Sequence, residues 1–129
     1  MKRLFILLLT LMLLTGCTAR PSAGTYRQIT AQEAAELMES ETGYIVLDVR
    51  TPAEYAERHI PGAINVPNET IGSIAPEQLP DRKQLILVYC RSGNRSKQAS
   101  EKLVKLGYTN IVEFGGINDW TGETVSGEA

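Results

Sequence analysis

The hydrophobic positions of this chain form several short continuous runs. Apolar and β-branched residues follow one another over residues 44–49, interrupted only by Asp48, and without interruption over residues 85–89. Such runs are typical of strands that are buried on both faces. Briefer runs at residues 63–66 and 111–112 predict two further strands.

Other segments place their apolar residues at helical spacing. A helix is predicted over residues 31–39. Thr30, just before it, and Glu33, in its first turn, have the spacing of a capping box. A longer helix is predicted over residues 96–106 and ends at Gly107. Two shorter helical segments are predicted, one opened by Thr51-Pro52 and one at residues 118–120.

Strands and helices therefore alternate along the chain. Alternation with continuous apolar strands predicts an α/β fold with a central parallel sheet and helices on both faces. We expect a single domain over residues 26–121, followed by a flexible tail at residues 122–129.

The N-terminus has the layout of an export signal. Lys2 and Arg3 precede an almost unbroken apolar run at residues 4–14. As a helix this run would measure roughly 16 Å, too short for a hydrocarbon core of about 30 Å. Residues 1–16 are thus predicted to be a signal peptide and not a transmembrane helix.

Residues 14–17, Leu-Thr-Gly-Cys, resemble the bacterial lipobox. The resemblance implies that Cys17 is lipidated and becomes the mature N-terminus, with residues 17–25 as a tether. The alternative is an ordinary Cys17 after a cleaved signal. The protein would then be lipid-anchored in the cell envelope, facing the periplasm or the exterior. Thr18 favours the outer membrane in a cell that has one.

The charge and the cysteine content argue against some classes of function. Without residues 1–16 the chain keeps 11 basic and 15 acidic residues, which does not favour nucleic-acid binding. If Cys17 is lipidated, Cys90 is the only thiol, so an internal disulfide and a metal site of paired cysteines are excluded. We expect a monomer with no metal and no bound cofactor.

The candidate functional residues lie where two predicted strands end. Asp48, Arg50 and Cys90 all fall at carboxyl ends, where ligands of open parallel sheets bind. Residues 90–96 join a strand to a helix, so successive backbone N–H groups can turn toward the Cys90 sulfur. This environment predicts a depressed pKa and a reactive thiolate at Cys90.

Three segments resemble the rhodanese family. They are the loop at residues 90–95, the pair of segments at residues 48–55 and 59–67, and Gly115-Gly116 with Trp120. The segments follow the family's order from about residue 26 to residue 120. The resemblance implies a three-layer α/β/α fold and a sulfurtransferase that carries sulfur as a persulfide on Cys90. It also implies thiosulfate or a similar donor, and cyanide or a thiol as acceptor.

The resemblance also suggests a division of roles within the loop. Arg91 and Arg95 would bind the sulfonate of the donor, and the backbone of residues 91–95 would stabilise the persulfide anion. The remaining substrate-binding positions of the loop are Ser92, Gly93 and Asn94.

Other polar residues are expected to have structural roles. Asp48, Arg50 and Glu54 are interpreted as ion-pair or capping residues, with Asp48 and Arg50 possible supports of the site. His59 is expected to hydrogen-bond a turn, and Trp120 to pack.

Two alternatives are open at this point. A phosphatase or arsenate reductase would also use a Cys loop, but phosphatase loops place five residues between Cys and Arg, whereas Cys90 and Arg95 enclose four. An internal arsenate relay would need a second thiol. The other alternative is a non-catalytic sulfur-carrier or protein-binding module.

Overall fold

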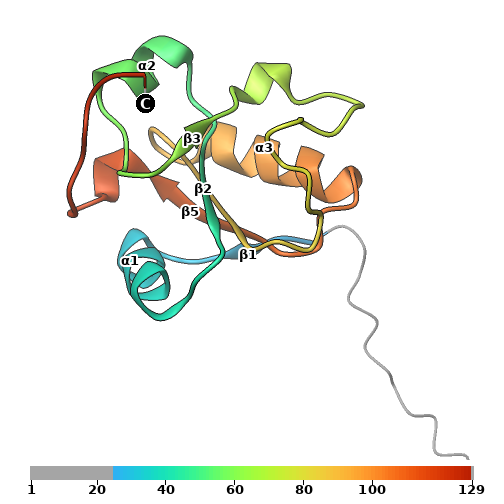
Figure 1. Cartoon of the computed structure of the whole chain (residues 1–129), viewed down its shortest axis with the longest axis horizontal. Helices are drawn as coiled ribbons and strands as arrows, with labels where there is room; N and C mark the ends of the chain where they lie inside the picture. Colours follow the sequence, from blue (N-terminus) through green and yellow to red (C-terminus); the bar gives the residue numbers. More distant parts are fainter. Residues whose placement is uncertain (1–24, 129) are drawn as a thin grey trace, which may run out of the picture.

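The computed structural model describes residues 25–128 and contains one all-parallel sheet of five strands. The strand order is β1-β5-β4-β2-β3 (Figure 1). The strands are β1 (Arg27–Gln28), β2 (Ile45–Asp48), β3 (Ile64–Asn65), β4 (Ile86–Cys90) and β5 (Ile111–Gly116). The predicted α/β class is therefore confirmed. The predicted signal peptide and Cys17 lie outside the described residues.

Three helices and two 3₁₀ turns connect these strands. They are α1 (Ala31–Ser40), α2 (Pro52–Glu57), η1 (Asn68–Thr70), α3 (Asn94–Lys105) and η2 (Ile117–Asp119). Capping boxes begin α1 and α2, with Thr30 and Thr51 as the N-caps. Within residues 25–128, no helix has the length and apolar character needed to cross a membrane.

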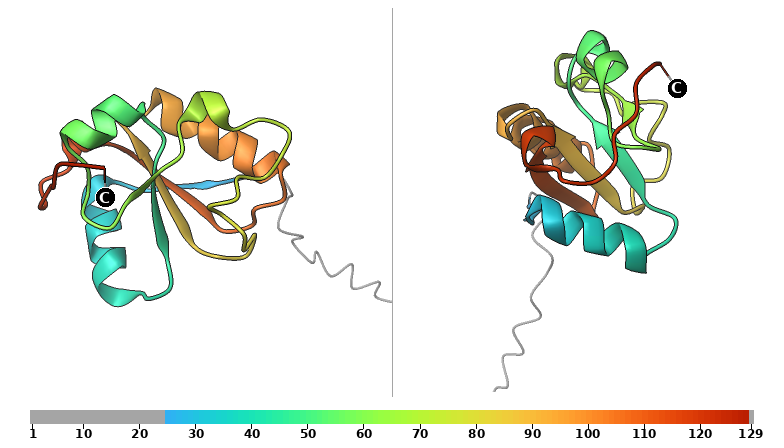
Figure 2. Two further views of the ribbon diagram at one scale, coloured as in Figure 1. Left: turned by 45° about the horizontal axis from the view of Figure 1, so that its top comes forward. Right: turned by 90° about the vertical axis from the view of Figure 1, so that its left-hand side faces the viewer.

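The sheet separates two apolar layers. On one face, Leu47 and Val88 pack with Ala99 and Leu103 of α3. On the other face, β-strand residues such as Leu87 pack with α1 and α2. Figures 1 and 2 show α1 and α3 on opposite sides of the sheet. This three-layer arrangement brings the strand ends, α2 and the start of α3 to one edge.

The structure differs from the sequence-based expectation at both ends of the domain. The short strand β1 was not predicted, because a polar two-residue segment has no apolar pattern. The segment from Gly122, expected to be a flexible tail, instead pairs with the body of the domain. His59 and Val125 exchange backbone hydrogen bonds of 2.8 and 2.9 Å, and the Gly127 N–H donates to Ala56. Figure 1 shows this segment running up to α2.

Candidate active site at the carboxyl ends of the strands

Cys90 is the last residue of β4 and lies at the mouth of a tight loop. Its side chain is buried, with the residue 1% exposed. The Gly93 N–H donates a hydrogen bond of 3.0 Å to Sγ, and the thiol donates to Ser96 Oγ at 3.4 Å. Because Gly93 caps α3 without a side-chain bond, the first N–H groups of this helix keep their positive dipole end near the loop. The loop therefore favours negative charge on sulfur.

The paired glycines of β5 make room for this loop. Cys90 pairs with Gly116, and the register between β4 and β5 shifts after Val88. Gly115 takes up the shift with a φ of 84°, which favours glycine. A Cβ on Gly116 would lie 1.9 Å from the Arg91 carbonyl oxygen. Only glycine at residue 116 lets β5 approach the loop this closely.

The Arg95 side chain is held by Glu54 of α2. Two hydrogen bonds of 2.6 and 3.0 Å join the guanidinium to the carboxylate. They are the main reason that the pKa of Glu54 falls to about 2. The same bonds raise the pKa of Arg95, and the charge of Cys90 acts in the same direction. Arg95 thus ties α3 to α2 and contributes positive charge near the sulfur, whereas the sequence suggested that it binds the donor.

A buried polar network lies beneath the loop. Arg50 pairs with Asp48 at 2.7 Å and donates to the Arg58 carbonyl, and the Tyr89 hydroxyl donates to Asp48 at 2.7 Å. Burial acts to lower the pKa of Arg50, but the hydrogen bonds and charge of Asp48 outweigh it, so this pKa is raised. Burial, followed by the charge of Asp48, raises the pKa of Tyr89. The ion pair expected from the sequence is present and is buried in the core.

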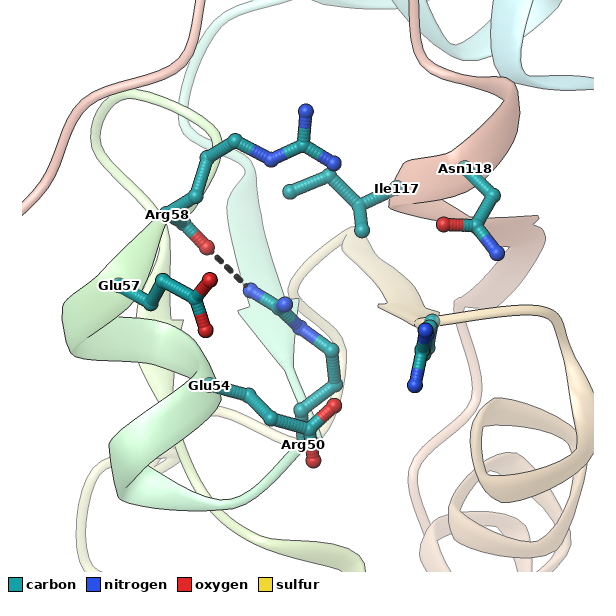
Figure 3. Close-up of a pocket in the computed structure, with 7 residues that line it drawn as sticks. Arg50, Glu54, Glu57, Arg58, Ile117 and Asn118 are labelled. Atoms are coloured by element: carbon teal, nitrogen blue, oxygen red, sulfur yellow. Dashed lines mark hydrogen bonds between the residues drawn. The ribbon is translucent and has the colours of Figure 1, made fainter.

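A pocket of about 480 Å³ opens beside the loop. Figure 3 shows Glu54 and Glu57 of α2 on one side of it, with Ile117 and Asn118 opposite. The rest of its lining is Arg50, Arg58 and Arg91. Among residues 25–128, neither Arg58 nor Arg91 forms an ion pair. The pocket therefore offers two guanidinium groups to an anion.

The other predicted residues are placed as follows. Ser92 is exposed on the loop, and Asn94 is exposed as the first residue of α3. His59 is buried and donates from Nδ1 to the Tyr55 carbonyl at 2.8 Å, as expected for a residue that fixes a turn. Trp120 packs against a ring of the core, with its centroid 6.2 Å from that of Phe114.

Sequence reasoning missed several residues of this site. Ser96 contacts Cys90, Glu113 contacts Ser96, and Arg58 and Asn118 line the pocket. The position of Ser96 six residues after Cys90, at the start of a helix, was a usable signal. Glu113 carried none, because one acidic residue in a short apolar run gives no indication of its partner. In the part of the chain that the structure describes, no cluster of three or more acidic, His or Cys side chains could hold a metal ion.

The fold and the loop define an α/β protein with a cysteine in a strand-loop-helix cradle. Comparison with known proteins gives the family: the profile described as "Rhodanese-like domain" matches residues 30–123. The chain belongs to the rhodanese-like domain family.

Several characterised relatives share this domain. The chain is 38% identical over 73 residues to thiosulfate sulfurtransferase PspE of Escherichia coli, covering 57% of this chain and 70% of that protein. It is 36% identical over 89 residues to thiosulfate sulfurtransferase 16 of Arabidopsis thaliana, covering 60% and 74%. It is 30% identical over 104 residues to the putative sulfur carrier protein YrkF of Bacillus subtilis, covering 80% of this chain but only 55% of YrkF.

Solved structures agree with the fold. A rhodanese with anions from E. coli superposes with a TM-score of 0.60 at 36% identity, covering 65% of this chain and 99% of that one. The rhodanese-like domain of the Anabaena Alr3790 protein gives a TM-score of 0.71 at 26% identity, covering 81% and 82%. The three-layer fold predicted from the sequence is confirmed.

Proposed function

We propose that this protein is a sulfurtransferase that takes sulfane sulfur from thiosulfate or a similar donor and passes it to a thiophilic acceptor. The observation that supports this most directly is the Cys90 sulfur, which accepts the Gly93 N–H at the positive end of α3. The next residue, Arg91, lines a pocket together with Arg58, and neither arginine forms an ion pair among residues 25–128. The relatives named thiosulfate sulfurtransferases point to the same chemistry.

The proposed reaction has two steps. The Cys90 thiolate attacks the outer sulfur of thiosulfate, a bond forms between the two sulfurs, and sulfite leaves with the electron pair of the broken S–S bond. The product is a persulfide anion on Cys90, with the charge on its outer sulfur. Cyanide or a thiolate then attacks that sulfur and regenerates the Cys90 thiolate. No bound cofactor takes part.

The pocket suggests how the donor is bound. Arg91, which the sequence already indicated, and Arg58 are the guanidinium groups available to the sulfonate end of the donor. Arg95 acts at a distance, through its charge, because Glu54 occupies its hydrogen-bonding edge. The N–H groups of residues 91–95 are the donors proposed to stabilise the persulfide anion.

Kinetic and mass measurements test this proposal. The purified protein should convert thiosulfate and cyanide to thiocyanate, and Cys90→Ser should abolish the reaction. Incubation with thiosulfate alone should add one sulfur, about 32 Da, to Cys90 because the thiolate is the attacking form. An unmodified Cys90 together with hydrolysis of p-nitrophenyl phosphate would instead support a Cys-loop phosphatase. Transfer by Cys90→Ser at the original rate would contradict the assigned nucleophile.

We also propose that the domain is displayed on the cell envelope by a lipid on Cys17. The proposal is supported by the short apolar run at residues 4–14 and the Leu-Thr-Gly-Cys sequence at residues 14–17. Several acyl chains hold a protein more firmly than a single myristoyl chain, since each buried methylene contributes about 0.8 kcal/mol. The physiological donor and acceptor would then be small molecules or proteins of that compartment.

A further inference from the structure

Glu113 is a buried carboxyl group that the proposed reaction does not yet use. It lies on β5, is 2% exposed, and forms no ion pair among residues 25–128. Its Oε1 accepts the Ser96 hydroxyl and the Gly115 N–H, each at 2.7 Å, and its Oε2 accepts the Gln28 amide at 3.5 Å. All of these partners are neutral donors, so no cationic side chain of the described residues pairs with this carboxyl group.

Ser96 connects this carboxyl to the reactive sulfur. Its Oγ lies 2.7 Å from Glu113 Oε1 and 3.4 Å from Cys90 Sγ, and its other contacts are the carbonyls of Gly93 and Gly115. A hydroxyl has one proton and two lone pairs. When Ser96 donates to Glu113, it can accept the Cys90 S–H. The three side chains then form one directed chain of hydrogen bonds from thiol to carboxylate.

We propose that Glu113 takes up the Cys90 proton through Ser96, an inference that rests on the proposed sulfur transfer. The S–H bond breaks as Ser96 receives that proton, and Ser96 passes its own proton to Glu113 Oε1. The products are a thiolate and a neutral carboxylic acid, and the pair keeps a single negative charge throughout. The thiolate then has the Ser96 O–H and the Gly93 N–H as donors. Glu113 is a positioning residue, because it never touches the substrate.

The surroundings of the pair contain few other titratable groups. Just before β1, burial, followed by the charges of Glu101 and Glu113, raises the pKa of Tyr26, so this hydroxyl stays neutral at ordinary pH. Glu101 belongs to α3, and so does Arg95, whose pKa is raised first by Glu54. On β4 the thiol of Cys90 is itself the second member of the pair. Among the described residues, Glu113 is therefore the one proton acceptor that the Ser96 hydroxyl links to Cys90.

The pH profile of Cys90 alkylation tests the proposal. Iodoacetamide modification would be followed by mass spectrometry of the tryptic peptide 84–91, which contains Cys90 and not Cys17. Two coupled groups titrate in two steps, so the wild-type rate should show a plateau at intermediate pH and a second rise at high pH. Glu113→Gln keeps an oxygen that can accept from Ser96 and Gly115, but it binds no proton. Its profile should show one step, close to the first step of wild type, because the amide resembles the neutral acid and the thiol then titrates alone.

Matched variants separate a relay from a structural role. Ser96→Ala should lower the rate on the plateau because the thiolate loses the Ser96 O–H donor, and Ser96→Thr should restore that rate because it keeps the hydroxyl. Ser100→Ala, on the same helix, removes a buried hydroxyl with no hydrogen-bond partner and should leave both steps unchanged. Two steps in Glu113→Gln, or an unchanged plateau in Ser96→Ala, would overturn the proposal. If Glu113→Gln does not fold, the Ser96 pair still decides the question.

This test is independent of the sulfur-transfer assay. Alkylation needs no sulfur donor, so a two-step profile with no thiocyanate formation would leave the relay standing and remove the proposed function. Thiocyanate formation with a one-step wild-type profile would do the reverse.

Discussion

The structure of the Cys90 loop, residues 90–96, depends on single residues that can each be tested by one substitution. Gly116 makes room for the Arg91 backbone, and Glu54 holds Arg95 beside the loop. At this scale the sequence indicated the loop, but it did not indicate that Arg95 pairs with Glu54. The reason is that an ion pair between α2 and α3 joins residues 41 positions apart, which no local pattern encodes.

Gly116→Ala should disturb both stability and activity. The new methyl group would meet the Arg91 carbonyl, so the loop or β5 must move, and overpacking of this kind costs about 1–3 kcal/mol of unfolding free energy. The free energy of unfolding measured in urea and the rate of sulfur transfer from thiosulfate to cyanide should both fall. Gly72→Ala is the control, because its Cβ would contact nothing within 4 Å. Equal stability of the two variants would refute the assigned close approach.

Glu54→Gln should weaken the protein in a pH-dependent way. The pKa of Glu54 is lowered from 4.5 to about 2 in the folded protein, so the pair stabilises the fold above the unfolded pKa and loses this effect as pH falls through the folded one. For a partly exposed pair we expect about 1 kcal/mol near pH 7. The difference from wild type in urea unfolding should shrink by roughly half between pH 5 and pH 3. Glu57→Gln on the same helix should show no such trend.

Elements with a strong local signal were predicted well. The capping boxes of α1 and α2, the apolar runs of β2 and β4, and the glycine that ends α3 all lie where the sequence indicated. Elements made by pairing alone were not found. The strand β1 pairs with β5, and Val125 pairs with His59, through backbone hydrogen bonds. Hydrogen bonding of this kind needs no apolar pattern.

Val125→Pro tests the contribution of the C-terminal bridge. Proline removes the N–H that donates to the His59 carbonyl at 2.9 Å, so the unfolding free energy should fall by about 0.5–1.5 kcal/mol. Val125→Ala keeps that N–H and should lose less. Hydrogen exchange at residue 125 should be protected in wild type. Rapid exchange there would argue for the flexible tail that the sequence suggested.

The whole molecule combines one sheet edge with a proposed membrane anchor. At the edge, β4, α3, β5 and α2 bring together a sulfur, a hydroxyl, a carboxyl and several guanidinium groups. The anchor would lie at the other end of a tether, at Cys17. Sulfur transfer and anchoring are therefore expected to be separable.

Cys17→Ser should release the protein from the membrane fraction without affecting sulfur transfer. The variant lacks the thiol that would be acylated, so it should appear among soluble envelope proteins after cell fractionation. Cys90→Ser should stay with the membrane. Retention of Cys17→Ser in the membrane fraction would show that some other feature holds the protein there.

The sequence by itself determined the helices, the buried strands and the position of Cys90, because these depend on local spacing and on short-range capping. Only the tertiary structure decided which charges meet, since parallel strands bring residues from distant segments to a common edge. There Glu54 pairs with Arg95, Asp48 pairs with Arg50 and accepts from Tyr89, and one hydroxyl links Glu113 to the Cys90 sulfur.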